Sequence, residues 1–360
     1  MSASLLGSRI IPGTTNNCRC HHRKSYNSKT IMSACVDNSC YDSEITQVVD
    51  RFLDNHVNFS RPNFPDLVTC SPLTHQEQNT SASIDGGVDR DDEMWLNIRE
   101  EAHSDVEQEP ILSGYYFCSI LAHDSLEKAL ATHLATKLSN SALPCITLVE
   151  IFSGVFKEDP EIRKAIRDDL RAAKDRDPAC ISYVHCLLNF KGFQACQAHR
   201  VAHKLWSQGR NVLALLIQNR VSEVFAVDIH PGAKIGRGIL LDHATGVVIG
   251  ETAVVGDNVS ILHNVTLGGT GKQSGDRHPK IGDGVLVGAG THILGNVRVG
   301  EGAKIGAGSV VLKEVPAGTT AVGNPARLLG CKENPIKLNK LPSFTMDHTS
   351  FISDWSGYVI

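Results

Sequence analysis

Apolar residues recur at every sixth position through much of the second half of the chain. The series has thirteen members: Ile229, Ile235, Leu241, Val247, Ala253, Val259, Val265, Ile281, Val287, Ile293, Val299, Ile305 and Val311. A period of six fits neither an α-helix, which repeats every 3.6 residues, nor a half-buried strand, which repeats every two. Because thirteen residues follow this spacing with only one interruption, we interpret the region as an internal repeat.

Each six-residue unit can form one short strand and one corner. The apolar residue points inward, and a glycine near the corner lets the backbone turn without a side-chain clash. Three units make one triangular coil, and stacked coils let each strand pair with its equivalents above and below. The pattern therefore predicts a parallel β-helix over residues 227–330, and the hexapeptide form of this fold is left-handed, an exception to the usual crossover rule.

Ten residues, GKQSGDRHPK at 271–280, interrupt the repeat. They cannot fit within a coil and must loop outward. The loop carries Asp276, Arg277 and His278 on a rigid scaffold, which is where binding residues concentrate. We interpret it as functional; the alternative is a tolerated surface insertion.

Residues 94–226 show a helical pattern instead. One face carries Leu126, Leu130, Leu134 and Leu138 at i, i+4 spacing. Asp124 is the expected cap of that helix, with Glu127 completing a capping box. A second helix is expected after Asp159, with Pro160 in its first turn. The fold class predicted is thus α+β, an all-α domain of six to eight helices followed by the β-helix.

The N-terminal residues differ in composition from the rest. Residues 1–36 contain five basic residues, six serines and no acid, a composition typical of an organelle transit peptide, although an ordinary N-terminus can also be serine-rich. Residues 37–91 are polar and turn-rich, and we interpret them as a flexible linker.

Composition narrows the function classes. The chain of 360 residues is 41% hydrophobic and 21% charged with a net charge of −4, so no broad basic field favours nucleic acid. No apolar run approaches the roughly 18 residues of a membrane span. Eleven irregularly spaced cysteines indicate a reducing compartment. The local group Cys18, Cys20, His21 and His22 lacks a second ligand pair, so no metal site is predicted there.

Several linked motifs resemble those of the serine acetyltransferases, the hexapeptide-repeat enzymes of cysteine synthesis. They are VDIHPGAKIGRGILLDHATG, LGGTGKQSGDRHPKIGDG and GNPAR in the repeat region, with DRDPAC and KGFQACQAHRVAHKLW in the helical region. The ending MDHTSFISDWSGYVI is similar to the plant branch. The resemblance covers residues 94–360 and implies transfer of an acetyl group from acetyl-CoA to the hydroxyl of L-serine, with acetyl-CoA as co-substrate and no permanently bound cofactor.

The resemblance identifies His243, in LLDHATG, as the catalytic base, and Asp228, in VDIHP, as its paired carboxylate. A serine hydroxyl needs its proton removed as it attacks, and an imidazole, with an ordinary pKa of about 6.5, suits that task. The carboxylate orients the ring and stabilises the imidazolium. Direct attack without an acyl-enzyme is the family pattern.

The resemblance also implies the substrate contacts. Arg277 would bind the serine carboxylate through two hydrogen bonds, with His278 beside it. Asp242 and Asp177 would hold the amino group. From the residues alone, Asp177, Asp228 and Asp242 could equally be turn residues, since aspartate suits turns.

Coenzyme A is expected along the outside of the β-helix. The positions implied are Gly269, Thr270, Ala289 and Ala307, with Lys304 placed to meet phosphate charge. Small residues there would let the pantetheine arm approach the backbone, although coil packing alone could also explain the alanines.

The resemblance further implies an assembly and partners. The expected state is a homotrimer or a dimer of trimers, with active sites between subunits. The tail at 331–360 is expected to bind O-acetylserine (thiol)lyase with Ile360 leading, and carboxylate capture by backbone groups is one such recognition mode. L-cysteine is the expected feedback inhibitor, and the chloroplast the expected location, with mitochondrion or cytosol as alternatives.

Three other functions were weighed. Another hexapeptide acyltransferase would share the fold but not the pairing of DRDP with GDRHP. A zinc enzyme would use His243, His263 and His292, which do not form an aligned ligand row within one subunit; a site between subunits is the alternative that stays open. A non-catalytic protein acting through its tail would not need the His243–Asp228 pair.

Overall fold

A computed structural model describes residues 90–271, 274–329 and 341–347 of the chain. The predicted transit peptide, the linker up to residue 89, the Cys18 cluster and Ile360 lie outside the described residues. Among the described residues, no helix is both long and apolar enough to cross a membrane.

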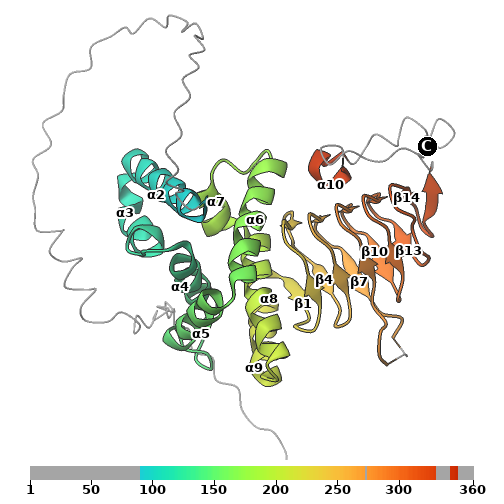
Figure 1. Ribbon diagram of the computed structural model, residues 1–360, viewed down its shortest axis with the longest axis horizontal. Coiled ribbons are helices and arrows are strands. Elements are labelled where there is room, and N and C mark those ends of the chain that lie inside the picture. The colour runs from blue at the N-terminus through green and yellow to red at the C-terminus, as the bar shows by residue number, and fades with distance from the viewer. Residues whose placement is uncertain (1–89, 272–273, 330–340, 348–360) are drawn as a thin grey trace, which may run out of the picture. The chain divides into compact units, whose positions relative to one another are not determined.

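Helices fill the first described part of the chain (Figure 1). In order they are α2 (Arg90–Gln108), η1 (Pro110–Leu112), α3 (Ser113–Tyr116), η2 (Phe117–Leu121), α4 (Leu126–Leu138), α5 (Cys145–Glu158), α6 (Pro160–Arg176), α7 (Tyr183–Asn189), α8 (Lys191–Ser207) and α9 (Asn211–Phe225). The four leucines predicted to share one face of α4 are all buried, so the i, i+4 spacing identified its core side correctly.

One of the two predicted helix caps is confirmed and the other is wrong. Asp159 caps α6, and its Oδ1 accepts hydrogen bonds from the backbone N–H groups of Glu161 and Ile162. At α4 the cap is Ser125, which accepts from the backbone of Lys128, whereas Asp124 forms an ion pair with the Lys128 side chain. The helix therefore begins one residue later than the acidic pattern indicated, because the serine hydroxyl fills the capping role.

The second part is a parallel β-helix with three sheets, which we call the prism, and the predicted fold class is confirmed. Its strands are β1 (Val227–Ile229), β2 (Lys234–Ile235), β3 (Leu240–Leu241), β4 (Val247–Ile249), β5 (Val254–Val255), β6 (Ser260–Ile261), β7 (Thr266–Gly268), β8 (Lys280–Ile281), β9 (Leu286–Val287), β10 (His292–Leu294), β11 (Arg298–Val299), β12 (Lys304–Ile305), β13 (Val310–Val311), β14 (Thr320–Val322) and β15 (Arg327–Leu329). Sheet A has the order β1-β4-β7-β10-β13, sheet B β11-β8-β5-β2 and sheet C β15-β14-β12-β9-β6-β3. From β1 to β13, successive strands along the chain pass from sheet A to B to C, as three units per coil require.

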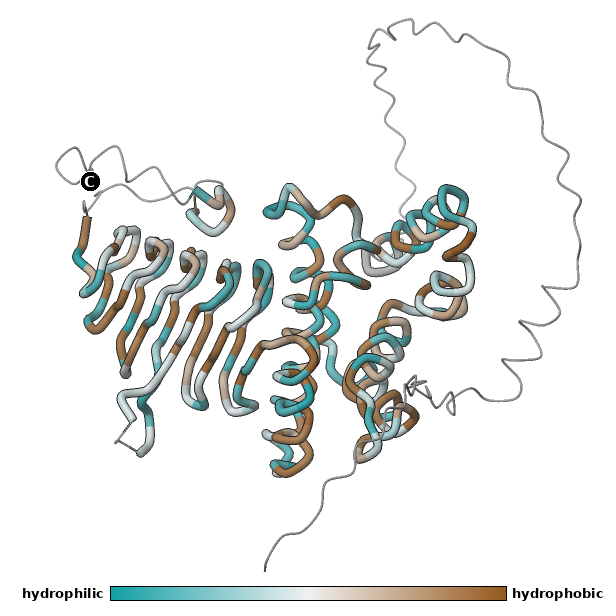
Figure 2. Tube along the Cα trace, turned by 180° about the vertical axis from the view of Figure 1, so that it is seen from behind, coloured by the Kyte–Doolittle hydropathy of each residue, from teal (hydrophilic) through white to brown (hydrophobic). Residues whose placement is uncertain are grey.

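The six-residue period is broken once more than the sequence indicated. Ile229 pairs with Ile249, 20 residues on, whereas Ile249 pairs with Leu267, 18 residues on. The first coil therefore contains two additional residues, and the series from Val247 to Val265 is two residues out of phase with the aliphatic row. Those residues are still buried, so a second inward row disguised the shift. The tube in Figure 2 shows hydrophobic stretches that recur from coil to coil.

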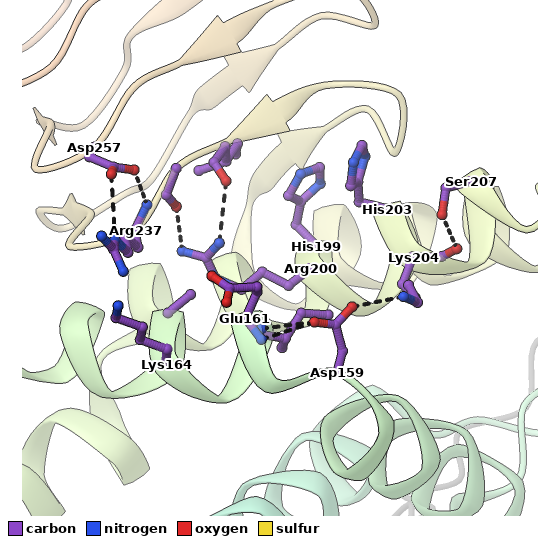
Figure 3. A pocket seen from close by; sticks show the side chains of 14 residues that line it. Asp159, Glu161, Lys164, His199, Arg200, His203, Lys204, Ser207, Arg237 and Asp257 are labelled. Carbon is purple, nitrogen blue, oxygen red and sulfur yellow. Dashed lines mark hydrogen bonds and ion pairs between the residues drawn. The ribbon is translucent and has the colours of Figure 1, made fainter. Parts of the chain in front are cut away.

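A buried ion pair joins the helices to the first coil. Arg200 of α8 binds Asp169 of α6 with an Nη2–Oδ2 distance of 2.6 Å. The same guanidinium donates to the carbonyls of Ile235 and Gly236 (Figure 3). Asp169 Oδ1 accepts the backbone N–H of Ile239 at 2.8 Å. Both charges are thus compensated by hydrogen bonds, as burial requires, and the helical part is fixed to the strands that carry the candidate site.

Candidate functional site

His243 lies at the edge of the prism where sheet C passes into sheet A. The corner between β3 and β4 contains the two additional residues of the first coil, and His243 and Ala244 both adopt positive φ angles of 54° and 56°. The bulge turns the imidazole outward, so that 76% of the side chain is exposed. An exposed ring nitrogen on a fixed corner can take a proton from a substrate that approaches from outside.

Two neighbours surround the His243 imidazole. Its Nε2 lies 3.8 Å from Oδ1 of Asp242. Its ring packs edge-to-face against His263 of the next coil at 5.8 Å between centroids. Within one chain, Asp242 is therefore the carboxylate beside the imidazole.

Asp228, the predicted partner, lies in the first strand of sheet A. Its Oδ1 accepts a hydrogen bond of 2.6 Å from Nε2 of Gln218 in α9. No hydrogen bond or ion pair joins Asp228 to His243 within the described parts of a single chain. The pairing of these two residues stays a prediction for the assembled protein.

The same edge of the prism continues along a column of equivalent corner positions. Backbone hydrogen bonds place Thr245, His263 and Ala289 at equivalent corner positions, because Asn264, Gly290 and Gly308 donate to their carbonyls in turn. Ala307 precedes Gly308 and completes the column. Ala289 is half-buried and Ala307 exposed, so two of the residues predicted to contact coenzyme A lie on the edge that leads to His243.

The loop predicted to bind substrate lies at the opposite edge of sheet A, between β7 and β8. Arg277 Nη2 donates to Oε2 of Glu251 at 2.8 Å, and its Nη1 donates to the carbonyl of Gly275 at 3.3 Å. His278 is buried with 7% exposure. Burial, followed by the nearby Arg277 charge, lowers the pKa of His278, which favours the neutral imidazole at neutral pH.

Gly269 and Thr270 belong to this second edge. A Cβ atom on Gly269 would lie 3.3 Å from both Arg277 Cγ and His278 Nε2, so glycine leaves room for the two side chains predicted to bind substrate. Thr270 is exposed beside Gly295. These two predicted coenzyme contacts are therefore on a different edge from Ala289 and Ala307 in one chain.

The last two predicted residues lie elsewhere on the molecule. Asp177 follows α6, and its Oδ1 accepts the backbone N–H of Ala179 at 2.8 Å, as expected of a turn residue. Lys304 is buried on sheet C, where its Nζ lies 3.5 Å from Oδ2 of Asp347. The lysine expected to meet a phosphate thus already has a carboxylate partner.

Thr252 and Gly250 were not identified from the sequence, although both support the loop. Thr252 contacts the backbone of Arg277 and the ring of His278, and the His278 ring lies against Gly250. Their position in the sequence could have indicated this role, because residues 250–252 (GET) form the corner one coil before the insertion.

A cavity of about 700 Å³ lies between α6, α8 and the first two coils (Figure 3). Asp159, Lys164, His203, Lys204 and Arg237 are among its lining residues, and none of the predicted site residues lines it. No group of three or more histidine, cysteine or acidic side chains suited to a metal occurs among the described residues. The cavity is therefore separate from the candidate site.

Two family models match the chain. The model "Serine acetyltransferase, N-terminal" matches residues 94–198, and "Bacterial transferase hexapeptide (six repeats)" matches residues 278–313. The chain is 63% identical over 329 residues to Serine acetyltransferase 1, chloroplastic, of Arabidopsis thaliana, covering 91% of this chain and 100% of that protein. It is 60% identical over 341 residues to Serine acetyltransferase 3, mitochondrial, of the same organism, covering 91% and 86%.

Solved structures agree with these matches. A soybean serine acetyltransferase complexed with serine has a TM-score of 0.66 and 62% identity, covering 68% of this chain and all of that chain. A Brucella abortus serine acetyltransferase in complex with coenzyme A has a TM-score of 0.67 and 49% identity, covering 68% and 98%. With its fold, its loop and its full-length relatives in agreement, this chain belongs to the serine acetyltransferase family.

Proposed function

We propose that this enzyme transfers the acetyl group of acetyl-CoA to the hydroxyl of L-serine, with His243 as general base. Nε2 of His243 takes the hydroxyl proton as the serine oxygen attacks the thioester carbonyl. The C–S bond then breaks, and the imidazolium returns the proton to the departing thiolate of CoA. The observation that carries this proposal is the two-residue bulge that presents His243 at an open edge of an otherwise closed prism.

The active site is proposed to form between subunits. His243 and the Arg277 loop lie at opposite edges of sheet A, so one chain cannot place both around one small amino acid. A neighbouring prism would bring its loop to the His243 edge, which fits the expected homotrimer or dimer of trimers. In that arrangement Gly269 and Thr270 of one subunit would face Ala289 and Ala307 of the next, and coenzyme A would bind between them.

Serine recognition is assigned to charges of both signs. The Arg277 guanidinium and His278 would bind the carboxylate, and Asp242 and Asp177 would bind the ammonium group. Asp228 would orient the imidazole, exchanging or sharing its bond to Gln218. Lys304 would have to leave Asp347 before it could meet a phosphate, so the phosphate contact is the weakest of these assignments.

Relatives support the choice of ligands. One neighbour is a complex with serine, another with coenzyme A, and a third, 47% identical with a TM-score of 0.69, is a complex with cysteine. We propose serine and acetyl-CoA as substrates and L-cysteine as inhibitor at the serine site, in the pathway of cysteine synthesis. We further propose O-acetylserine (thiol)lyase as partner of the tail ending in Ile360, and the chloroplast as location.

The test is thiol release from acetyl-CoA in the presence of L-serine. His243→Ala should lower kcat about 10²- to 10⁴-fold, the usual contribution of a general base, and leave the KM for acetyl-CoA within a few-fold. His103→Ala, which removes an exposed imidazole from α2, is the matched control and should retain most activity. Full activity of His243→Ala, or no turnover of serine by the unmodified enzyme, would refute the proposal.

A further inference from the structure

We propose that Thr252 is a positioning residue that fixes both Arg277 and the tautomer of His278, and so sets the affinity for the serine carboxylate. This inference rests on the proposed function. Thr252 lies in the corner between β4 and β5, one coil before the inserted loop, and no substrate contact is assigned to it.

The Thr252 hydroxyl holds the backbone of the loop. Its Oγ1 accepts hydrogen bonds of 3.1 Å from the backbone N–H of Arg277 and 3.1 Å from that of His278. Two successive N–H groups are thereby bound to one atom. The backbone from which the Arg277 and His278 side chains extend is consequently held in place by Thr252.

The same residue determines which nitrogen of His278 carries the proton. The backbone N–H of Thr252 donates to Nδ1 at 3.2 Å, so Nδ1 must be an acceptor. Oγ1 lies 2.9 Å from Nδ1 and also forms a side-chain hydrogen bond with Asp276, so the backbone N–H is the donor that requires Nδ1 to be unprotonated. With Nδ1 unprotonated, the neutral ring has its proton on Nε2.

Nε2 lies against two glycines. A Cβ on Gly250 would lie 2.1 Å from Nε2, and one on Gly269 would lie 3.3 Å from it, so the ring keeps its place only because both positions lack a side chain. Among the described residues, no hydrogen-bond partner of Nε2 is present. Thr252 therefore makes His278 present an N–H donor, which an anionic carboxylate can accept.

The corner itself is rigid, so the orientation is transmitted to the loop. Ala253, which follows Thr252, is buried in the prism core. The Thr252 carbonyl accepts from Lys280 Nζ at 2.8 Å, and the same amine donates to the His278 carbonyl at 2.8 Å. Glu251 meanwhile holds the Arg277 guanidinium from the other side of the corner.

The experiment compares Thr252→Val with Thr252→Ser in the full-length chain. Valine keeps the shape but removes the hydroxyl, whereas serine keeps it. Thr252→Val should raise the KM for L-serine about ten-fold, as expected for loss of about one charge-assisted hydrogen bond. Its KM for acetyl-CoA should stay within about two-fold, and Thr252→Ser should restore the serine KM.

A spectroscopic readout tests the tautomer directly. The ¹⁵N spectrum of histidine-labelled protein, with the His278 signal assigned by its loss in His278→Asn, should show an Nε2-protonated ring in the unmodified enzyme and in Thr252→Ser. Thr252→Val keeps the backbone N–H that donates to Nδ1 but loses the hydroxyl beside it, so the fraction of rings protonated on Nδ1 should rise relative to the unmodified enzyme. If valine destabilises the fold, Thr252→Ala with the same serine control takes its place.

The outcomes separate this inference from the proposed function. An unchanged serine KM in Thr252→Val, or an equal defect in valine and serine variants, would overturn the role of Thr252. Arg277→Ala is measured in parallel and should raise the serine KM at least as much. If Arg277→Ala has no effect on the serine KM, the assignment of Arg277 itself is wrong, whatever Thr252 does.

Discussion

At the scale of single residues, the proposed catalytic base lies where the coil departs from its repeat. A repeat unit of strictly six residues would leave no position for His243. The two extra residues lengthen the corner between β3 and β4 and put the imidazole outside the core. The positive φ angles of His243 and Ala244 show the cost of the bulge, since non-glycine residues adopt this region infrequently. Backbone strain of this kind is tolerated at functional sites.

Gly250 should be as sensitive as a binding residue, although it has no side chain. In Gly250→Ala the new Cβ would meet the His278 ring at 2.1 Å, so the ring must move. We expect a raised KM for L-serine with a smaller effect on the KM for acetyl-CoA, measured by steady-state kinetics. Gly154→Ala is the control, because Gly154 in α5 has open space around it, and alanine should stabilise that helix by roughly 0.5–1 kcal/mol. Equal serine kinetics in both variants would contradict the contact.

His199 should make the protein less stable in acid. Burial lowers its pKa to about 3, whereas the unfolded residue titrates near 6.5. Between these two pKa values the imidazole binds a proton in the unfolded state but not in the folded state, so the free energy of unfolding falls as pH decreases. His199→Leu should reduce this slope between pH 7 and pH 5 in urea unfolding, by on the order of 1 kcal/mol per pH unit at most. The exposed His103 provides the control, and an equal change of slope in His103→Leu would argue against a role for burial.

At the scale of elements, the short helix α10 (Pro342–Thr345) fastens the chain to sheet C. Phe344 lies under the buried guanidinium of Arg176, with Cζ 4.4 Å from the ring centroid. Ser260 Oγ donates to the Ser343 carbonyl at 3.0 Å. The segment that precedes the predicted partner-binding tail therefore contacts the end of α6, next to Asp177.

This contact makes Phe344 a measurable contributor to stability. Phe344→Leu keeps an apolar side chain but removes the aromatic face, and should lower the free energy of unfolding by about 0.5–2 kcal/mol. Phe344→Tyr keeps that face and should remain close to the unmodified protein. Thermal unfolding monitored by circular dichroism gives the comparison, and a tyrosine variant as unstable as the leucine variant would count against a cation–π contribution.

The elements also show what a sequence can and cannot predict. The inward rows of the prism were predictable because their period is local, and Asp159 with Pro160 marked a helix start unambiguously. The additional residues at His243 were not, because Val247 and Ile249 both point inward and conceal the shift. The partner of Lys304 could not be predicted either, because Asp347 is distant in sequence and belongs to no repeat. The role of Thr252 could not be predicted because a polar residue in a corner has the same pattern as any turn residue.

At the scale of the whole molecule, the Asp169–Arg200 pair should be the most sensitive link between helices and prism. Its side chains are 1% and 8% exposed. Asp169→Asn would leave the Arg200 charge buried without its counterion and should cost about 3–5 kcal/mol. The exposed Asp124–Lys128 pair is the control, and Asp124→Asn should change stability by less than about 1 kcal/mol. Chemical unfolding of the two variants measures the difference, and similar losses would show that burial of the pair does not matter.

The proposal that sites are shared between subunits makes a distinctive prediction. His243→Ala and Arg277→Ala each remove one half of every site, so each pure variant should be nearly inactive. Because the two residues lie at opposite edges of sheet A, a mixed oligomer can pair an intact His243 from one chain with an intact Arg277 from its neighbour. Random mixing in a cyclic oligomer should restore about a quarter of the sites, and about a third in trimers selected to contain both variants.

The measurement is thiol release after the two variants, carrying different affinity tags, are co-expressed and purified through both tags. Variants mixed only after separate purification are the control, and they should stay inactive as long as subunits do not exchange. Activity near that of the pure variants in the doubly tagged oligomer would mean that His243 and Arg277 serve the same site from the same chain. The loop would then have to cross the face of sheet A within one subunit, which the contacts of Thr252 and Glu251 with Arg277 oppose.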